Sequence, residues 1–311
     1  MRIERLGSRG PELSVIGFGA WEAGEGREWG AAPPTERTLD AIRAAPDAGI
    51  TWIDTAEVYG KGRSEELVAT AIGSRRDELV LATKVAPRPS GTGFRPDEVR
   101  RACEGSLRRL GTDRIDVYQL HWPDRSGVAL EETWGAMAGL VDEGLVRSIG
   151  LSNFDRSQIE RCEAVRHVDS LQQEFSMLEL EDRDLIRWCG EHGTGVLSYG
   201  PLAYGLLTGA ITEATTFVRG DHRAGAGGLF GPERRAANLE VVEGMRPIAE
   251  RLGIDLAQLA LAWNVHQPGV TSAIAGSRDP EHVRSNAAAG DVVLDDETLA
   301  AIEAILPVAP G

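Results

Sequence analysis

The chain has 311 residues, and its 33 Lys and Arg against 48 Asp and Glu give a formal net charge of −15. This acidic balance argues against non-specific binding to nucleic acid or to anionic membranes, because both require a positively charged protein surface. A hydrophobic share of 42% with 26% charged residues excludes a disordered or fibrous chain, and the 37 glycines predict many tight turns.

Two kinds of segment alternate from about residue 13 to residue 290. Short apolar runs rich in β-branched residues predict strands, and amphipathic runs bounded by capping residues predict helices. The expected strands cover 13–19, 50–54, 78–85, 114–121, 146–153, 170–176, 194–200 and 269–276. The expected helices between them cover 35–48, 64–72, 96–110, 130–144, 155–165, 182–192 and 280–289.

Individual residues mark the ends of these helices. We expect Ser64 to cap the second helix, Pro96 to lie in the first turn of the third, and Asp279 to cap the helix that starts at Pro280. Glycine follows several of the helices, where a left-handed cap favours it. Much of the glycine excess therefore has a structural explanation.

The repeated alternation of strand and helix predicts parallel strands closed into a (β/α)8 barrel, with an open doubly wound sheet as the alternative. Neither nucleotide fingerprint is present, since Glu22 stands where the third glycine of GxGxxG belongs and the GKGRS run at 60–64 lacks the upstream glycine of a P-loop. Residues 202–236 are polar, glycine-rich and irregular, which is typical of a lid. Further helices are expected at 237–252, 255–266 and 295–305.

The cysteines and the N-terminus indicate a cellular location. Cys103, Cys162 and Cys189 are widely spaced and form no CxxC, so neither a disulfide framework nor a metal site is expected. The first ten residues hold no apolar stretch of a signal peptide, and no apolar run approaches the roughly 18 residues of a membrane span. We expect a soluble cytoplasmic protein with reduced thiols.

Polar residues stand where successive strands end, and in such barrels the site lies at the C-terminal ends of the strands. Asp54 ends the second strand, Tyr59 lies in the loop after it, Lys84 belongs to the third strand and His121 to the fourth. A buried ammonium needs a carboxylate partner, and Lys84 beside Tyr59 would lower the pKa of that phenol. The four residues predict proton delivery to an oxygen atom.

Seven further segments carry recognisable motifs: WIDTAEVYGKGRSEELVATAI (52–72), LATKV (81–85), YQLHWPD (118–124), IGLSNF (149–154), LQQEFSMLE (171–179), LSYGPLAYGLLTG (197–209) and AIAGSRDPEHVRSN (273–286). In these segments the chain resembles the aldo-keto reductases, with matching order and spacing from residue 13 to about 290.

The resemblance implies one barrel domain over residues 1–311, with an N-terminal β-hairpin, a long cofactor-covering loop and extra C-terminal helices. It implies NAD(P)(H)-dependent reduction of aldehydes and ketones, or oxidation of the corresponding alcohols and sugars. Asp54, Tyr59, Lys84 and His121 fall on the catalytic tetrad of the family. Tyr59 would be the general acid or base, Lys84 would lower its pKa, Asp54 would hold the lysine, and His121 would orient the carbonyl oxygen.

A cofactor site is implied by the same resemblance. Tyr199 would stack on the nicotinamide ring, and Arg278 would face a 2′-phosphate, which a guanidinium binds bidentately. The residues implied at the carboxamide are Ser152, Asn153 and Gln173, those over the pyrophosphate are Gly200, Pro201 and Leu202, and those at the adenosine end, besides Arg278, are Gly276, Ser277, His282 and Asn286. We expect NADP(H) to be favoured over NAD(H), although Gly276 replaces a basic residue of many members and Asp279 adds a nearby negative charge.

Trp21 and Trp122 are implied at the mouth of the substrate pocket, with Phe18 and Trp29 as further candidates. A pocket with tryptophans and few charges suits small aldehydes, ketones, alcohols or sugars. Two alternatives stay open at this point. One is a cofactor-binding regulatory subunit with little turnover, and the other is a phosphate-binding barrel isomerase or lyase.

Overall fold

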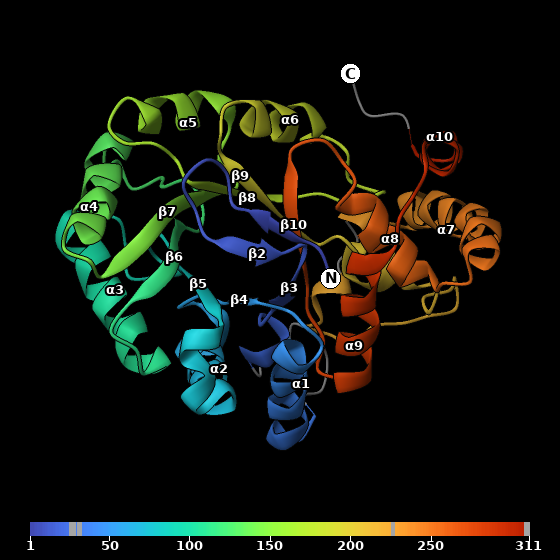
Figure 1. Cartoon of the computed structure of the whole chain (residues 1–311), viewed down its shortest axis with the longest axis horizontal. Coiled ribbons are helices and arrows are strands. Elements are labelled where there is room, and N and C mark those ends of the chain that lie inside the picture. The colour runs from blue at the N-terminus through green and yellow to red at the C-terminus, as the bar shows by residue number, and fades with distance from the viewer. Residues whose placement is uncertain (25–28, 30–32, 225–227, 308–311) are drawn as a thin grey trace.

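The computed structural model describes residues 1–24, 29, 33–224 and 228–307. Eight parallel strands close into a barrel in the order β10-β3-β4-β5-β6-β7-β8-β9 (Figure 1). Their bounds are β3 (Ile16–Gly19), β4 (Trp52–Asp54), β5 (Val80–Val85), β6 (Ile115–Leu120), β7 (Val146–Ser152), β8 (Ser170–Glu174), β9 (Gly195–Tyr199) and β10 (Val270–Ala275). The predicted barrel is confirmed, and the closed ring excludes the open doubly wound sheet.

Helices surround this ring (Figure 1). They are α1 (Thr35–Asp47), α2 (Arg63–Ile72), α3 (Pro96–Leu110), α4 (Leu130–Asp142), α5 (Arg156–Glu163), α6 (Arg183–Glu191), α7 (Pro232–Leu252), α8 (Leu256–Asn264), α9 (Pro280–Ala288) and α10 (Asp296–Glu303). Helix α7 starts five residues before the expected 237, because Pro232 has the fixed φ that suits a first helical turn. None of the described helices is long and apolar enough to cross a membrane.

An N-terminal hairpin closes the end of the barrel where the strands begin. Strands β1 (Ile3–Arg5) and β2 (Glu12–Ser14) pair antiparallel, as expected. Leu6 and Leu13 are fully buried and pack in one cluster with Trp52, Val117 and Leu197 of the barrel. In Figure 1 the hairpin lies across the middle of the ring. The hairpin therefore covers the end of the barrel where the strands begin.

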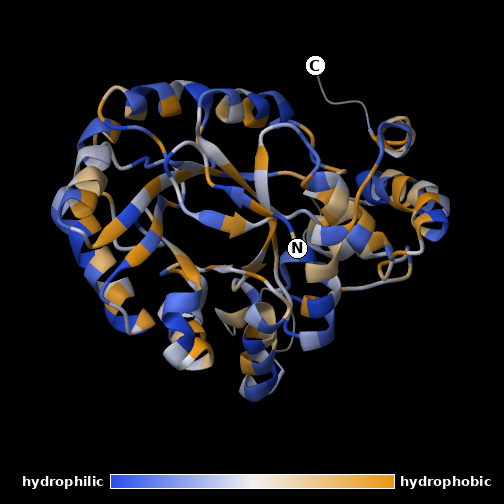
Figure 2. Ribbon diagram, viewed as in Figure 1, coloured by the Kyte–Doolittle hydropathy of each residue, from blue (hydrophilic) through white to orange (hydrophobic). Residues whose placement is uncertain are grey.

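The helices pack on the barrel through one apolar face. In α3 the buried residues Val99, Cys103 and Leu110 recur at helical spacing, while the arginines between them are exposed or half-buried. Figure 2 shows the resulting mixture of hydrophobic and hydrophilic residues along each outer helix. All three cysteines lie in this packed layer, where burial raises the pKa of each thiol to about 12.

Two expectations about local structure need correction. Ser64 does not cap α2, which follows Gly62 with φ 92°. Its buried hydroxyl donates to the main-chain oxygen of Ala20 at 2.7 Å and shares a hydrogen bond with Thr55 Oγ1. The irregular segment 202–236 holds three short 310 helices, η5 (Ala203–Thr208), η6 (His222–Ala224) and η7 (Gly228–Phe230), before α7 begins; residues 225–227 lie outside the described chain.

Candidate active site

A buried ion pair lies at the centre of the barrel mouth. Lys84, from β5, donates to both carboxylate oxygens of Asp54 at 2.6 and 2.8 Å and to the main-chain oxygen of Thr55 at 2.9 Å. Its Nζ also lies 3.5 Å from the phenol oxygen of Tyr59. Because Lys84 is fully buried, these oxygens replace the water that the ammonium loses on folding.

Tyr59 reaches this ion pair from the short helix η3 (Tyr59–Gly62). The next residue, Gly60, has φ 58°, and a Cβ there would lie 1.9 Å from the main-chain oxygen of Gly24. The backbone at Gly60 therefore passes so close to Gly24 that only glycine fits at position 60, and this close approach fixes the start of η3. The Tyr59 ring meets the His121 ring edge-on at 5.6 Å, so the phenol, ammonium and imidazole converge at one point.

Burial sets the protonation of these groups. It raises the pKa of Tyr59 well above its ordinary value, and the negative charge of Asp54 adds to this effect. It also lowers the pKa of His121 well below 6.5, with a smaller contribution from the Lys84 charge. The net shift of the Tyr59 pKa is therefore upward, because burial and the Asp54 charge both disfavour the phenolate. At neutral pH the phenol keeps its proton and the imidazole is neutral.

A cavity of about 1000 Å³ extends from this point across the barrel mouth. Asp54, Tyr59 and His121 line it, while Lys84 lies beneath them. The implied cofactor and substrate residues that also line it are Ser152, Asn153, Tyr199, Gly200, Pro201, Leu202, Gly276, Ser277, Arg278, His282, Asn286, Trp21 and Trp122. Trp29 lines it too, whereas Phe18 is buried in the core behind it.

Gln173 does not reach the cavity, and this assignment needs correction. In β8 side chains alternate, so Gln172 points into the barrel and Gln173 points away. Gln173 donates to Asp182 Oδ2 at 2.7 Å outside the barrel, whereas Gln172 donates to Asp54 Oδ1 at 2.8 Å and lines the cavity. The motif contains two consecutive glutamines. Which of them faces the interior of the barrel depends on the alternation of side chains along β8, and the motif itself does not reveal it.

Three polar side chains connect the ends of β6, β7 and β9 beside the catalytic candidates. Tyr199 donates its hydroxyl to Asn153 Oδ1 at 2.7 Å. The amide nitrogen of Asn153 donates to the main-chain oxygen of His121 at 3.0 Å and to Ser152 Oγ at 3.1 Å. Asn153 has φ 65°, a backbone region that asparagine tolerates better than most residues. The ring of Tyr199 is thereby fixed relative to His121.

Basic and hydroxyl groups from the loop after β10 and from α9 also line the cavity. Arg278 donates to the main-chain oxygen of Trp29 at 2.7 Å, and Ser277 shares a hydrogen bond with His282. Asp279 is turned away, since its carboxylate caps α9 and pairs with Arg37 at 2.6 Å. The predicted cap is confirmed, and the negative charge of Asp279 is neutralised by a partner outside the cavity.

Several lining residues were not anticipated from the sequence. Tyr204 and His222 come from the irregular segment 202–236 and pack against Trp21 and Trp29. Other additional lining residues are Glu22, Glu174, Arg223, Asp255 and Ser285. For Tyr204 and His222 the sequence offers only the lid-like composition of residues 202–236 as an indication. A loop has no periodicity from which the direction of its side chains can be predicted.

The residues of the cavity fit a nicotinamide dinucleotide. An aromatic face, Tyr199, and a guanidinium, Arg278, line the same cavity, as a nicotinamide ring and a phosphate require. Two loops approach closely at its wall, since a Cβ on Gly276 would lie 2.6 Å from the main-chain oxygen of Gly19. The absence of a side chain at Gly276 leaves room there for backbone and ligand.

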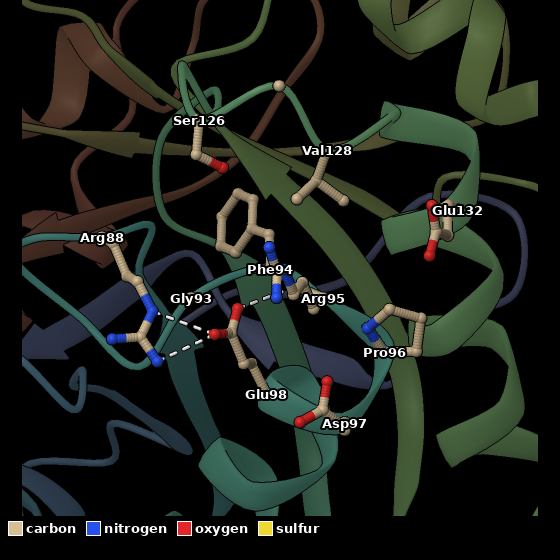
Figure 3. Close-up of a pocket in the computed structure, with 11 residues that line it drawn as sticks. Arg88, Gly93, Phe94, Arg95, Pro96, Asp97, Glu98, Ser126, Val128 and Glu132 are labelled. Atoms are coloured by element: carbon tan, nitrogen blue, oxygen red, sulfur yellow. Dashed lines mark hydrogen bonds and ion pairs between the residues drawn. The ribbon is translucent and has the colours of Figure 1, made fainter.

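A second cavity of about 670 Å³ lies outside the barrel mouth, between the start of α3 and residues 126–132 (Figure 3). Arg88 and Glu98 lie side by side in its wall and pair at 2.8 Å (Figure 3). Glu98 also accepts from the main-chain nitrogen of Arg95 at 3.1 Å. These charges neutralise each other, so the first cavity is the stronger candidate for chemistry.

Comparison with known proteins gives a consistent result. The model of the Aldo/keto reductase family matches residues 15–307. The chain is 38% identical over 288 residues to an aldo-keto reductase of Bacillus subtilis, covering 90% of this chain and 86% of that protein. It is 32% identical to the NADH-specific methylglyoxal reductase of Escherichia coli, covering 94% of each. It is 31% identical to a probable voltage-gated potassium channel subunit beta of Arabidopsis thaliana, covering 94% and 92%.

Solved structures agree with this result. The glycerol dehydrogenase of Gluconobacter oxydans superposes with a TM-score of 0.88 at 30% identity, covering 99% of this chain and 98% of that one. An aldo-keto reductase of Klebsiella pneumoniae in complex with NADPH superposes with a TM-score of 0.76 at 34% identity, covering 99% and 97%.

Proposed function

The chain belongs to the aldo/keto reductase family of NAD(P)H-dependent oxidoreductases, and we propose that it reduces small aldehydes or ketones, or oxidises the corresponding alcohols, with Tyr59 as the proton-transfer group. The observation that carries this proposal is the contact of Tyr59 with a buried Lys84–Asp54 pair at the mouth of a cavity that fits the cofactor. The bound cofactor supplies the hydride in reduction and accepts it in oxidation.

Tyr59 acts as general acid in the reductive direction. Its raised pKa keeps the phenol protonated at neutral pH, which is the form that donates a proton to a carbonyl oxygen. Lys84 stabilises the phenolate that remains, because a positive charge 3.5 Å away favours the ionised form as it develops. Asp54 holds the ammonium in place. The neutral imidazole of His121 is a hydrogen-bonding group that orients the same oxygen.

We propose NADP(H) as the preferred cofactor. Arg278 supplies the charge that a 2′-phosphate needs, and Asp279 is occupied by Arg37 rather than facing that phosphate. The NADPH complex of the Klebsiella pneumoniae neighbour supports this choice, whereas the NADH-specific relative of Escherichia coli opposes it. Comparing the Michaelis constants for NADPH and NADH tests the preference, and a lower value for NADH contradicts it.

The substrate is a small uncharged carbonyl compound or alcohol. Trp21, Trp29 and Trp122 line the cavity. The Trp21 ring stacks on Tyr59 with centroids 6.1 Å apart, and Trp122 stacks on His121 with centroids 3.6 Å apart. Flat apolar faces of this kind suit short carbon chains and sugars better than polyanions. The names of two neighbours, a methylglyoxal reductase and a glycerol dehydrogenase, support substrates of this size.

A cofactor-binding regulatory subunit is the second candidate function. The relative from Arabidopsis thaliana favours it, since that protein is called a probable channel subunit. This candidate predicts tight NADPH binding without turnover on any carbonyl compound. The enzyme is favoured here because a pure binding protein does not need a buried ion pair in contact with a phenol.

The decisive experiment follows NADPH oxidation by absorbance against a panel of small carbonyl compounds. We expect Tyr59→Phe to lower kcat by about 10²- to 10⁴-fold, the usual contribution of a general acid, and to leave NADPH affinity unchanged. Tyr118→Phe is the matched control, since Tyr118 is also a buried tyrosine but lies outside the cavity. Full activity of Tyr59→Phe contradicts the proposed mechanism.

A further inference from the structure

An acidic side chain, Glu22, lies at the end of the cavity where the phosphates of the cofactor are expected. Glu22 starts the short helix η1 (Glu22–Gly24), directly after β3, and β3 pairs with β10, whose following loop carries Arg278. The two side chains meet, with Arg278 Nε 3.7 Å from Glu22 Oε2, and both line the cavity. Their side chains are only 20% and 24% exposed, so water screens the interaction weakly.

The basic groups around Glu22 are those a phosphate would use. Arg278, Arg223 and His282 each lower the pKa of the Glu22 carboxyl, although burial is the largest influence and raises it. These groups come from different elements, since Arg223 belongs to η6 and His282 to α9. Arg223 also pairs with Asp221 at 2.8 Å, so Arg278 is the guanidinium of this group that Glu22 opposes directly.

We propose that Glu22 competes with a phosphate group of the nicotinamide cofactor for Arg278, so that the cofactor binds by exchanging the carboxylate partner of this arginine for its own phosphate. The inference rests on the proposed function, in which Arg278 faces that phosphate. At 3.7 Å the Glu22 carboxylate interacts with Arg278 through charge and not through a hydrogen bond, so an incoming phosphate competes with it for the same positive charge. The displaced carboxylate then remains in a partly desolvated cavity beside a like charge, which opposes binding.

The neighbouring acid Asp279 shows why Glu22 is singled out. Asp279 follows Arg278 directly, but its carboxylate caps α9 and pairs with Arg37 at 2.6 Å. It therefore has partners that phosphate binding does not remove. Glu22 forms its ion pair with Arg278, and that arginine is the residue the phosphate needs. Glu22 is thus a specificity-determining residue that weakens the binding of a cofactor phosphate at Arg278.

The test is a direct titration of NADPH and of NADH into the purified protein, followed by quenching of tryptophan fluorescence. We expect Glu22→Gln, and also Glu22→Ala, to tighten NADPH binding at least about tenfold, because the like charge and the competing partner are both removed. Glu281→Gln is the matched control, since it removes one negative charge from the exposed side of α9, and we expect no change. In the Arg278→Ala background the gain from Glu22→Gln should fall below about threefold.

The two cofactors distinguish the phosphate involved. A gain for NADPH alone assigns the competition to the 2′-phosphate, and an equal gain for NADPH and NADH assigns it to the pyrophosphate. Unchanged or weaker binding by folded Glu22→Gln and Glu22→Ala overturns the inference. A wild-type protein that binds neither cofactor overturns the proposed function instead, so the two failures are separate.

Discussion

The barrel buries a charge cluster at each end, and the two clusters differ in what surrounds them. Where the strands begin, Asp116 accepts hydrogen bonds from Arg76 at 2.7 Å, from Arg147 at 3.0 Å and from the main-chain nitrogen of Leu81 at 2.9 Å. Where the strands finish, Lys84 is held equally well by Asp54 and Thr55. Both charges are almost completely buried and well paired.

The difference lies in the neighbours of each pair. Asp116 is enclosed by guanidinium groups and backbone, and it does not line the large cavity. Lys84 adjoins a phenol on the cavity wall, and the nearby His121 Nδ1 is buried with no hydrogen-bond partner among the described residues. A buried ion pair by itself thus indicates stability, and it indicates chemistry only when a titratable group and a cavity adjoin it.

The largest expected effect comes from removing the lysine at the cavity end. We expect Lys84→Met to lower kcat by about 10²- to 10⁴-fold and the free energy of unfolding by about 3–5 kcal/mol, because Asp54 is left buried without a cation. The double variant Asp54→Asn with Lys84→Met should recover most of the stability but none of the turnover. Steady-state kinetics and urea denaturation measure both quantities, and turnover restored in the double variant would contradict the role of Lys84.

The opposite end should show the reverse pattern. We expect Asp116→Asn to lower the free energy of unfolding by about 2–3 kcal/mol, since Arg76 loses its buried partner. Values of kcat and KM should stay at those of the wild type. Urea denaturation and steady-state kinetics again provide the measurements. A changed KM would show that the two ends of the barrel are coupled, which the separate hydrogen-bond networks do not predict.

The smallest expected effect is a pH dependence of stability. Burial lowers the pKa of folded His121 below its ordinary value of about 6.5, so the unfolded chain binds the extra proton first. The contribution of His121 is therefore present above pH 6.5 and is lost as the pH falls, by up to about 2 kcal/mol between pH 7 and pH 5. Urea denaturation across this range should show a shallower pH dependence for His121→Gln. The exposed His192→Gln should retain the wild-type dependence, and equal slopes for all three proteins would contradict the effect.

Part of the site followed from the sequence, because strand ends carry it. Asp54, Lys84 and His121 stand at the ends of consecutive strands, and a period of two combined with parallel pairing places them at one mouth. The assignment of Gln173 to the cofactor site was wrong for the same reason. A shift of one residue along β8 turns the side chain to the other face of the strand. Ser64 looked like a helix cap, but the burial of the start of α2 gave its hydroxyl two other partners.

The sequence by itself determined the family, the order of strands and helices and the identity of the residues at the strand ends, because local periodicity and motif spacing are written along the chain. The tertiary structure alone decided that Glu22 meets Arg278, that Asp279 turns toward Arg37 and that Tyr59 keeps its proton. Each of these features depends on burial and on contacts between loops. Neither can be predicted from the periodicity of residues along the sequence.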